Sequence, residues 1–221
     1  MVASVKDYHL ITYSRAEELA NSISHGVAAV MSLAGLVFLL VASVRTADPY
    51  RITSCAIYGS VLCLFYLVST LYHSMRNQKA RYVFRILDHA GIYLVIAGTY
   101  TPIALVSLRA GYGWVLFGVV WVLALAGIIF KSFMTHKLAF VAPIFYIVLG
   151  WLIVIDMTEV LAMIPHRGVA WLVAGGLSYS FGILFYAVDR IPFNHAIWHL
   201  FVMVGSLCHY LAILWYVVPL P

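Results

Sequence analysis

The chain has 221 residues, of which 64% are hydrophobic and only 10% are charged. That composition excludes a soluble globular domain and indicates an integral membrane protein. The formal net charge of +5 needs no nucleic-acid partner, because basic loops beside anionic lipid headgroups are the ordinary use of excess Lys and Arg in such a chain.

The apolar residues predict helices that cross a membrane. Such a helix needs about 20 mostly apolar residues, and seven stretches joined by short linkers approach that length. Each is a long apolar run without alternating polarity, which favours helices over barrel strands. The sequence predicts one all-α, seven-helix transmembrane bundle over residues 23–218, after a polar lead over residues 1–22 that has no signal-peptide pattern. The expected spans are 23–44, 53–73, 86–107, 114–131, 138–156, 168–188 and 195–218.

The distribution of basic residues predicts the orientation of the bundle. Cytoplasmic loops carry an excess of Lys and Arg, and a cytoplasmic N-terminus places most of the 13 basic residues on the inner side. The C-terminus is then expected outside. The inner set is Lys6, Arg15, Arg76, Lys79, Arg81, Arg85, Lys131, Lys137 and Arg190, and the outer set is Arg45, Arg51, Arg109 and Arg167.

Ligand-type side chains from three of these spans are expected at one depth. His195 and His199 are one helical turn apart at the start of the last span, so both rings lie on one helix face about 6 Å apart. His73 ends the second span, and Asp88 lies near the start of the third. In the predicted topology all four lie near the cytoplasmic boundary, where an ionisable side chain indicates a functional site.

Three imidazoles with an open fourth position are a known zinc coordination. Imidazole suits Zn²⁺ better than Mg²⁺ or Ca²⁺, which prefer oxygen ligands, although iron, cobalt and nickel also accept it. Asp88 is expected to orient a ligand or to accept a proton from a zinc-activated water. Ser69, one turn from His73, is expected to contact that water or to stabilise an oxyanion. The sequence therefore predicts His73, His195 and His199 as metal ligands, with Asp88 and Ser69 as catalytic residues.

Several separated motifs follow one another along the chain: Glu18-Leu19-Ala20-Asn21 with His25-Gly26, Ser69-Thr70-Leu71-Tyr72-His73, Asp88-His89-Ala90-Gly91-Ile92-Tyr93, Ala97-Gly98-Thr99-Tyr100-Thr101-Pro102 and His195-Ala196-Ile197-Trp198-His199. Together they resemble the hemolysin III branch of the progestin and adiponectin receptor superfamily. The compact form, without the long N-terminal extension of the adiponectin receptors, implies a bacterial protein of the plasma (inner) membrane. That resemblance spans residues 17 to 218 and implies a seven-helix bundle with one zinc ion. It also implies hydrolysis of lipid acyl bonds, with amides such as ceramide-like lipids as substrates, whereas a peptide hormone is not expected.

Three classes of function remain to be compared. The first is a zinc-dependent hydrolase, and the second is a sensor or regulator of membrane lipid state in which zinc only holds the helices together. The third, an ion or proton transporter, is disfavoured because the central membrane thickness offers almost no ionisable group besides His209. A retinal protein is excluded because every lysine lies in the lead or in a loop.

The remaining polar residues have simpler interpretations. His25 is expected to cap the first helix by a hydrogen bond more than to line the cavity, and His89 is expected to point away from the metal. His209 is expected to make one hydrogen bond between helices. Asp156 and Glu159 are expected to be solvated residues at the outer end of the fifth span.

Overall fold

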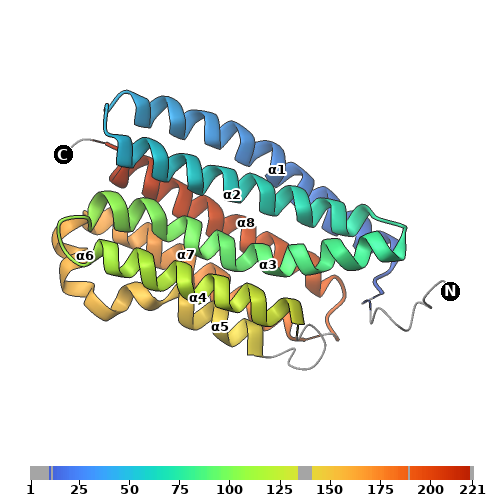
Figure 1. The fold of residues 1–221 in the computed structure, drawn as a ribbon. Coiled ribbons are helices and arrows are strands. Elements are labelled where there is room, and N and C mark those ends of the chain that lie inside the picture. The colour runs from blue at the N-terminus through green and yellow to red at the C-terminus, as the bar shows by residue number, and fades with distance from the viewer. Residues whose placement is uncertain (1–9, 11, 134–140, 189, 220–221) are drawn as a thin grey trace.

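The computed structural model describes residue 10 and residues 12–133, 141–188 and 190–219. The regular structure in these ranges is helical, and seven helical segments are long and apolar enough to cross a membrane. Figure 1 shows them packed side by side as a bundle, which confirms the predicted fold class. The elements are α1 (Arg15–Val44), α2 (Pro49–Ser74), α3 (Gln78–Pro102), α4 (Gly113–Phe133), α5 (Val141–Gly150), α6 (Met157–Met163), α7 (His166–Tyr186) and α8 (Asn194–Ala212), with π-helical turns at Ile103–Ser107 and Ile213–Val217 and a 3-10 turn at Leu152–Asp156.

Side chains immediately before the first three helices fix where those helices begin. Ser14 and Glu17 form a reciprocal capping box at the start of α1. Asp48 caps α2 ahead of Pro49 in the first turn, and Asn77 caps α3. Each cap satisfies backbone N–H groups that lack a partner inside the helix, typically worth about 1 kcal/mol. Residues in or next to the linkers therefore fix the position at which each of these helices begins.

Helix α1 begins at Arg15, inside the polar lead that the sequence predicts for residues 1–22. Polar side chains in the first turns of α1 point into the bundle. Lys6 and Lys137, which entered the predicted charge asymmetry, lie outside the described residues. Which end of the bundle faces the cytoplasm stays a prediction.

The helices differ in how deeply they are buried. The apolar segment of α3 is 67% buried inside the protein, compared with 22% for α1 and 17% for the α5–α6 segment. Helix α3 therefore runs through the centre of the bundle between α2 and α4, whereas α1 packs at the periphery against α2 and α8. The outward face of α1 carries exposed apolar side chains such as Val30 and Phe38, as expected for a surface in contact with lipid tails.

The fifth span is interrupted, although the sequence predicts a continuous stretch over residues 138–156. Helix α5 ends at Gly150, and a 3-10 turn connects it to α6. The hydroxyl of Tyr100 in α3 donates to the carbonyl of Gly150 at 2.8 Å and accepts from the N–H of Ile153 at 3.0 Å. A neighbouring helix thus satisfies backbone groups that the break releases, which is a condition for non-helical backbone within a membrane.

The helices that carry the predicted site residues meet at the end of the bundle where α1 begins, which we call the α1-start end (Figure 1). Helices α1, α3 and α8 begin there, and α2 finishes there. The first turns of three helices and the last turn of a fourth therefore lie near one another. Each of the five residues predicted for the site lies on one of these helices.

Candidate metal centre

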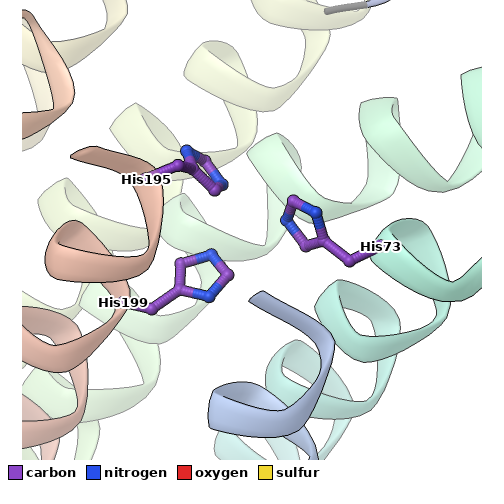
Figure 2. A group of neighbouring side chains, drawn as sticks. All are labelled: His73, His195 and His199. Atoms are coloured by element: carbon purple, nitrogen blue, oxygen red, sulfur yellow. The ribbon is translucent and has the colours of Figure 1, made fainter. Parts of the chain in front are cut away.

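Three histidines converge at the α1-start end (Figure 2). His73 lies in the last turn of α2, and His195 and His199 lie in the first turns of α8. One side-chain nitrogen from each residue lies within 4.8 Å of the other two, and all three residues are buried. The ring centroids are 4.6 to 5.1 Å apart. The structure therefore brings together all three residues that the sequence predicts as metal ligands.

The ring nitrogens of this cluster are suited to binding a cation. Among the described residues, the Nε2 atom of His73 and both ring nitrogens of His195 have no hydrogen-bond partner. Leaving a buried polar group without a partner costs about 1–3 kcal/mol. A divalent ion shared by the three imidazoles would offset that cost, and it would leave coordination positions open for water or substrate.

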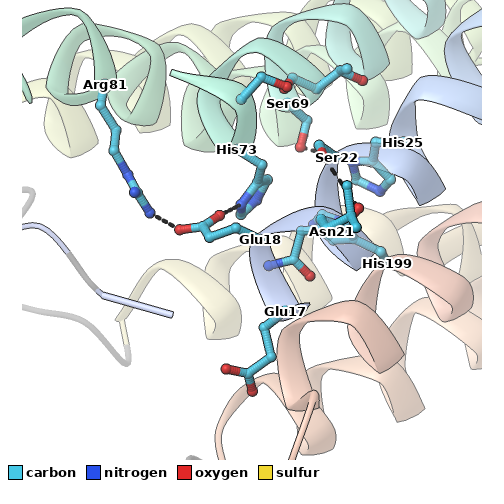
Figure 3. Close-up of polar contacts among 12 residues, drawn as sticks. Glu17, Glu18, Asn21, Ser22, His25, Ser69, His73, Arg81 and His199 are labelled. Carbon is cyan, nitrogen blue, oxygen red and sulfur yellow. Dashed lines mark hydrogen bonds and ion pairs between the residues drawn. The ribbon is translucent and has the colours of Figure 1, made fainter. Parts of the chain in front are cut away.

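Helix α1 supplies hydrogen bonds to two of the three imidazoles (Figure 3). The Nδ1 atom of His73 lies 2.8 Å from Oε2 of Glu18, and the Nδ1 atom of His199 lies 3.1 Å from the hydroxyl of Ser24. The other carboxylate oxygen of Glu18 forms an ion pair with Arg81 of α3. Partners of this kind hold metal-binding histidines in one orientation. Sequence reasoning gave Glu18 a place in a family motif but no role, and it did not find Ser24.

The ring of Tyr13 covers the cluster just before α1 begins. Its centroid lies 5.1 Å from that of His195 and 6.1 Å from that of His73. Burial raises the pKa of the Tyr13 phenol, and the nearby Tyr72 hydroxyl adds to that increase. Tyr13 therefore remains a neutral aromatic cover that limits the contact of water with the histidines.

Ser69 and Asp88 lie beside the histidine cluster, and their catalytic roles stay predictions. Ser69 is buried one turn before His73 on α2, and its hydroxyl lies 2.7 Å from Nδ1 of His25. Asp88 is buried on α3, contacts Ser69, and lines a small pocket together with His195. The arrangement places a carboxylate and a hydroxyl within reach of molecules bound near the imidazoles.

His25 does not cap the first helix, so that expectation from the sequence is wrong. The capping residue is Ser14, and the ring of His25 stacks on His199 at a centroid distance of 3.5 Å and an interplanar angle of 10°. The side chain reaches from α1 to Ser69 of α2 and belongs to the inner wall of the site. The alternative weighed from the sequence, a place lining the cavity, fits better.

His209 behaves as expected, whereas the two acids do not. The Nδ1 atom of His89 lies 2.8 Å from the carbonyl oxygen of Arg85 in the same helix. His89 is not one of the three clustered histidines, but it lines the pocket of Asp88 and His195. His209 makes the expected hydrogen bond between helices, from α8 to the carbonyl of Leu172 in α7 at 3.1 Å. Asp156 caps α6, and both Asp156 and Glu159 are half-buried, so they are not simply solvated.

An apolar cavity adjoins the polar pocket that contains Asp88 and His195. It lies between α3, α5, α7 and α8, and Gly150 and Trp151 at the break in the fifth span form part of its wall. The cavity and the polar pocket share four lining residues: Ile92, Tyr146, Ile183 and Trp198. An apolar group in the cavity would therefore lie next to the pocket of Asp88 and His195.

Fold and site together define a class: a seven-helix membrane protein with a buried three-histidine cluster at one end of the bundle. The sequence profile described as "Haemolysin-III related" matches residues 13–210 of this chain, a range that includes Glu18 and all three histidines. The chain belongs to the hemolysin III family. The resemblance seen in the sequence motifs is thereby confirmed.

Bacterial and animal relatives match over nearly the whole chain. It is 41% identical to "Hemolysin-3" of Bacillus cereus over 203 residues, covering 92% of this chain and 93% of the relative. It is 40% identical to "Hemolysin-3 homolog" of Bacillus subtilis, covering 93% and 96%. The human "Monocyte to macrophage differentiation factor" is 31% identical, covering 89% and 83%. The similarity therefore extends across all seven spans and the site.

Proposed function

We propose that this protein is a zinc-dependent intramembrane hydrolase that cleaves a lipid acyl bond, an amide of the ceramide-like type, at the cytoplasmic side of a bacterial plasma membrane. The observation that carries the proposal is the shared wall between the polar pocket at the histidine cluster and the apolar cavity. The lining of the cavity is apolar, as that of an acyl-chain site would be, and the adjoining pocket is lined by Asp88 and His195. Its partners are membrane lipids.

The proposal gives each residue one task. His73, His195 and His199 hold the zinc ion, which when bound lowers the pKa of a water molecule to about 7 and polarises a carbonyl. Asp88 takes the proton that the attacking water loses and passes it to the leaving nitrogen as the carbon–nitrogen bond breaks. The hydroxyl of Ser69 contacts both Asp88 and Nδ1 of His25, so it orients the Asp88 carboxylate toward the attacking water.

Metal analysis of the purified protein tests the first part of this proposal. We expect about one zinc ion per chain, because three protein ligands form one open site, and we expect His195→Ala and His199→Ala to lose it. Mass spectrometry of lipids incubated with the wild-type protein should show released fatty acid, and His199→Ala should show none. His209→Ala is the matched control, since His209 contacts α7 far from the cluster, and it should keep its zinc.

A second function uses the same ligands. In a sensor or regulator of membrane lipid state, zinc would hold α2 and α8 together without chemistry, and a lipid in the apolar cavity would change the conformation. The specific observation that favours it is the near-complete burial of the three histidines. Removal of zinc would then lower thermal stability, and no lipid would be hydrolysed by the zinc-loaded protein.

A further inference from the structure

The first turns of α1 contact both helices that carry the histidine cluster, although α1 itself carries none of the three histidines. Glu18 contacts His73 at the end of α2, and Ser24 contacts His199 on α8. Glu17 accepts a hydrogen bond at 3.0 Å from the N–H of Phe193, the residue just before α8 and its His195. Figure 3 shows Glu18 between His73 and Arg81, with Glu17 pointing away from the histidines.

The spacing of polar residues on α1 explains why this helix can do so. Glu18, Asn21 and His25 follow the spacing of one helix face, and Asn21 and His25 are fully buried. Leu19 and Ile23, on the opposite side, are 60% and 55% exposed. Helix α1 therefore turns a polar stripe toward the cluster and an apolar face toward lipid.

The hydrogen bonds from α1 determine which ring nitrogen carries the proton. A carboxylate can only accept, so the contact between Glu18 and His73 places the proton on Nδ1 of His73. The hydroxyl of Ser24 donates its single proton to the carbonyl of Asn21 at 3.0 Å, so it accepts from Nδ1 of His199. In both imidazoles the lone pair is then on Nε2, which is free to bind a metal ion.

We propose that α1 is the positioning element of the metal centre. Glu18 and Ser24 fix the tautomer and orientation of His73 and His199, and the ion pair with Arg81 holds Glu18 in place. This inference rests on the metal site of the proposed function, and it does not depend on hydrolysis. Glu18 and Ser24 are positioning residues, because each acts through an imidazole.

The affinity of the purified, metal-free protein for Zn²⁺ tests the role of Glu18. We expect Glu18→Ala to weaken zinc binding by roughly 10- to 100-fold, the usual effect of removing a hydrogen-bond partner of a ligand histidine. Glu18→Gln should fall between Glu18→Ala and wild type, because its amide oxygen still accepts from Nδ1 but without the charge. Should Glu18→Ala fail to fold, Glu18→Gln alone carries the test.

Spectroscopy separates positioning from a general loss of stability. In the Co²⁺-substituted protein, Glu18→Ala should shift the visible absorption bands, because the donor strength of His73 changes. Glu159→Ala is the matched control, since Glu159 lies near Gly111 at the other end of the bundle. It should bind zinc as the wild type does and leave the bands unshifted.

Ser24→Ala provides a second, independent variant. We expect a several-fold loss of zinc affinity, smaller than for Glu18→Ala because a neutral hydroxyl is a weaker acceptor than a carboxylate. Ser22→Ala is its matched control, because within the described part of the chain the hydroxyl of Ser22 bonds only the carbonyl of Leu19 in its own helix. That variant should bind zinc with wild-type affinity.

The outcomes of these measurements are distinct. Zinc affinities of Glu18→Ala and Ser24→Ala within twofold of wild type would overturn the inference, even if the wild type hydrolyses lipid. A wild type that binds zinc but releases no fatty acid would refute the proposed hydrolase and leave the positioning role standing. A wild type without zinc affinity would refute the metal site and the role of α1 together.

Discussion

Asp88 is the residue that best distinguishes a catalytic metal centre from a structural one. It is buried on α3, contacts Ser69, and shares a pocket with His195, but it does not belong to the group of three histidines that could hold the ion. A purely structural zinc would have no need of a carboxylate opening into that pocket. The side chain can therefore be altered without removing a ligand.

We expect Asp88→Asn to retain zinc and to lose at least 100-fold in lipid turnover, because an amide cannot accept the proton of the attacking water. Zinc content and fatty-acid release measured on the same preparation check this. Asp156→Asn, a change at the cap of α6, should leave turnover unaltered. Full turnover by Asp88→Asn would show that the assigned proton acceptor is wrong.

At the level of residues, the sequence predicts the ligands better than their surroundings. His195 and His199 are recognisable because their spacing fixes them on one helix face, whatever the helix packs against. Glu18, Ser24 and His25 depend instead on how α1 is rotated about its axis relative to α2 and α8. That rotation follows from side-chain packing between helices, which an apolar run does not reveal.

Among the helices, the sequence predicts where the spans lie but not where they break. The number of spans follows from the length of each apolar run, and the structure has the same number. The break after Gly150 depends on the hydroxyl of Tyr100, a residue about fifty positions earlier in the chain. Such a contact leaves no periodic signal in the fifth span itself.

Helices α7 and α8 pack closely around Gly175. A Cβ atom at this position would lie 2.5 Å from the ring of His209 and 3.0 Å from the carbonyl oxygen of Gly205. Both contacts are shorter than ordinary van der Waals distances, and the backbone carbonyl cannot rotate away. Small residues allow this kind of close approach between transmembrane helices.

We expect Gly175→Ala to lower the free energy of unfolding by about 1–3 kcal/mol, because α7 and α8 must move apart or His209 must give up its hydrogen bond. Thermal melting in detergent measures the change. The matched control is Gly118→Ala on α4, where an added Cβ would meet no described atom within 4 Å. Its melting temperature should stay the same or rise, and a loss as large as that of Gly175→Ala would refute the packing argument.

For the whole molecule, the three-histidine cluster brings together distant parts of the chain. His73 belongs to α2, and His195 and His199 belong to α8, so an ion bound to all three joins the second span to the last. A ligand that binds only the folded state stabilises it in proportion to the logarithm of its concentration over its dissociation constant. Zinc should therefore stabilise the bundle as a whole.

Chelation of zinc should lower the melting temperature of the wild-type protein by several degrees, since saturation at about 1,000 times the dissociation constant corresponds to roughly 4 kcal/mol. The same chelator should not affect His195→Ala, which lacks a ligand. Scanning calorimetry in detergent, or a melt followed by fluorescence without a thiol-reactive dye, measures the melting temperatures of the wild type and of His195→Ala. Equal melting temperatures for the wild type with and without zinc would show that the ion does not bridge α2 and α8.

The separation of the ligands along the chain also bears on biosynthesis. A nascent polypeptide emerges from its N-terminus, so the helix with His73 is synthesised long before the helix with His195 and His199. The complete set of three imidazoles exists only after the last helix has been translated and inserted. A chain truncated before α8 would lack two of three ligands, so uptake of the ion would mark the completion of assembly.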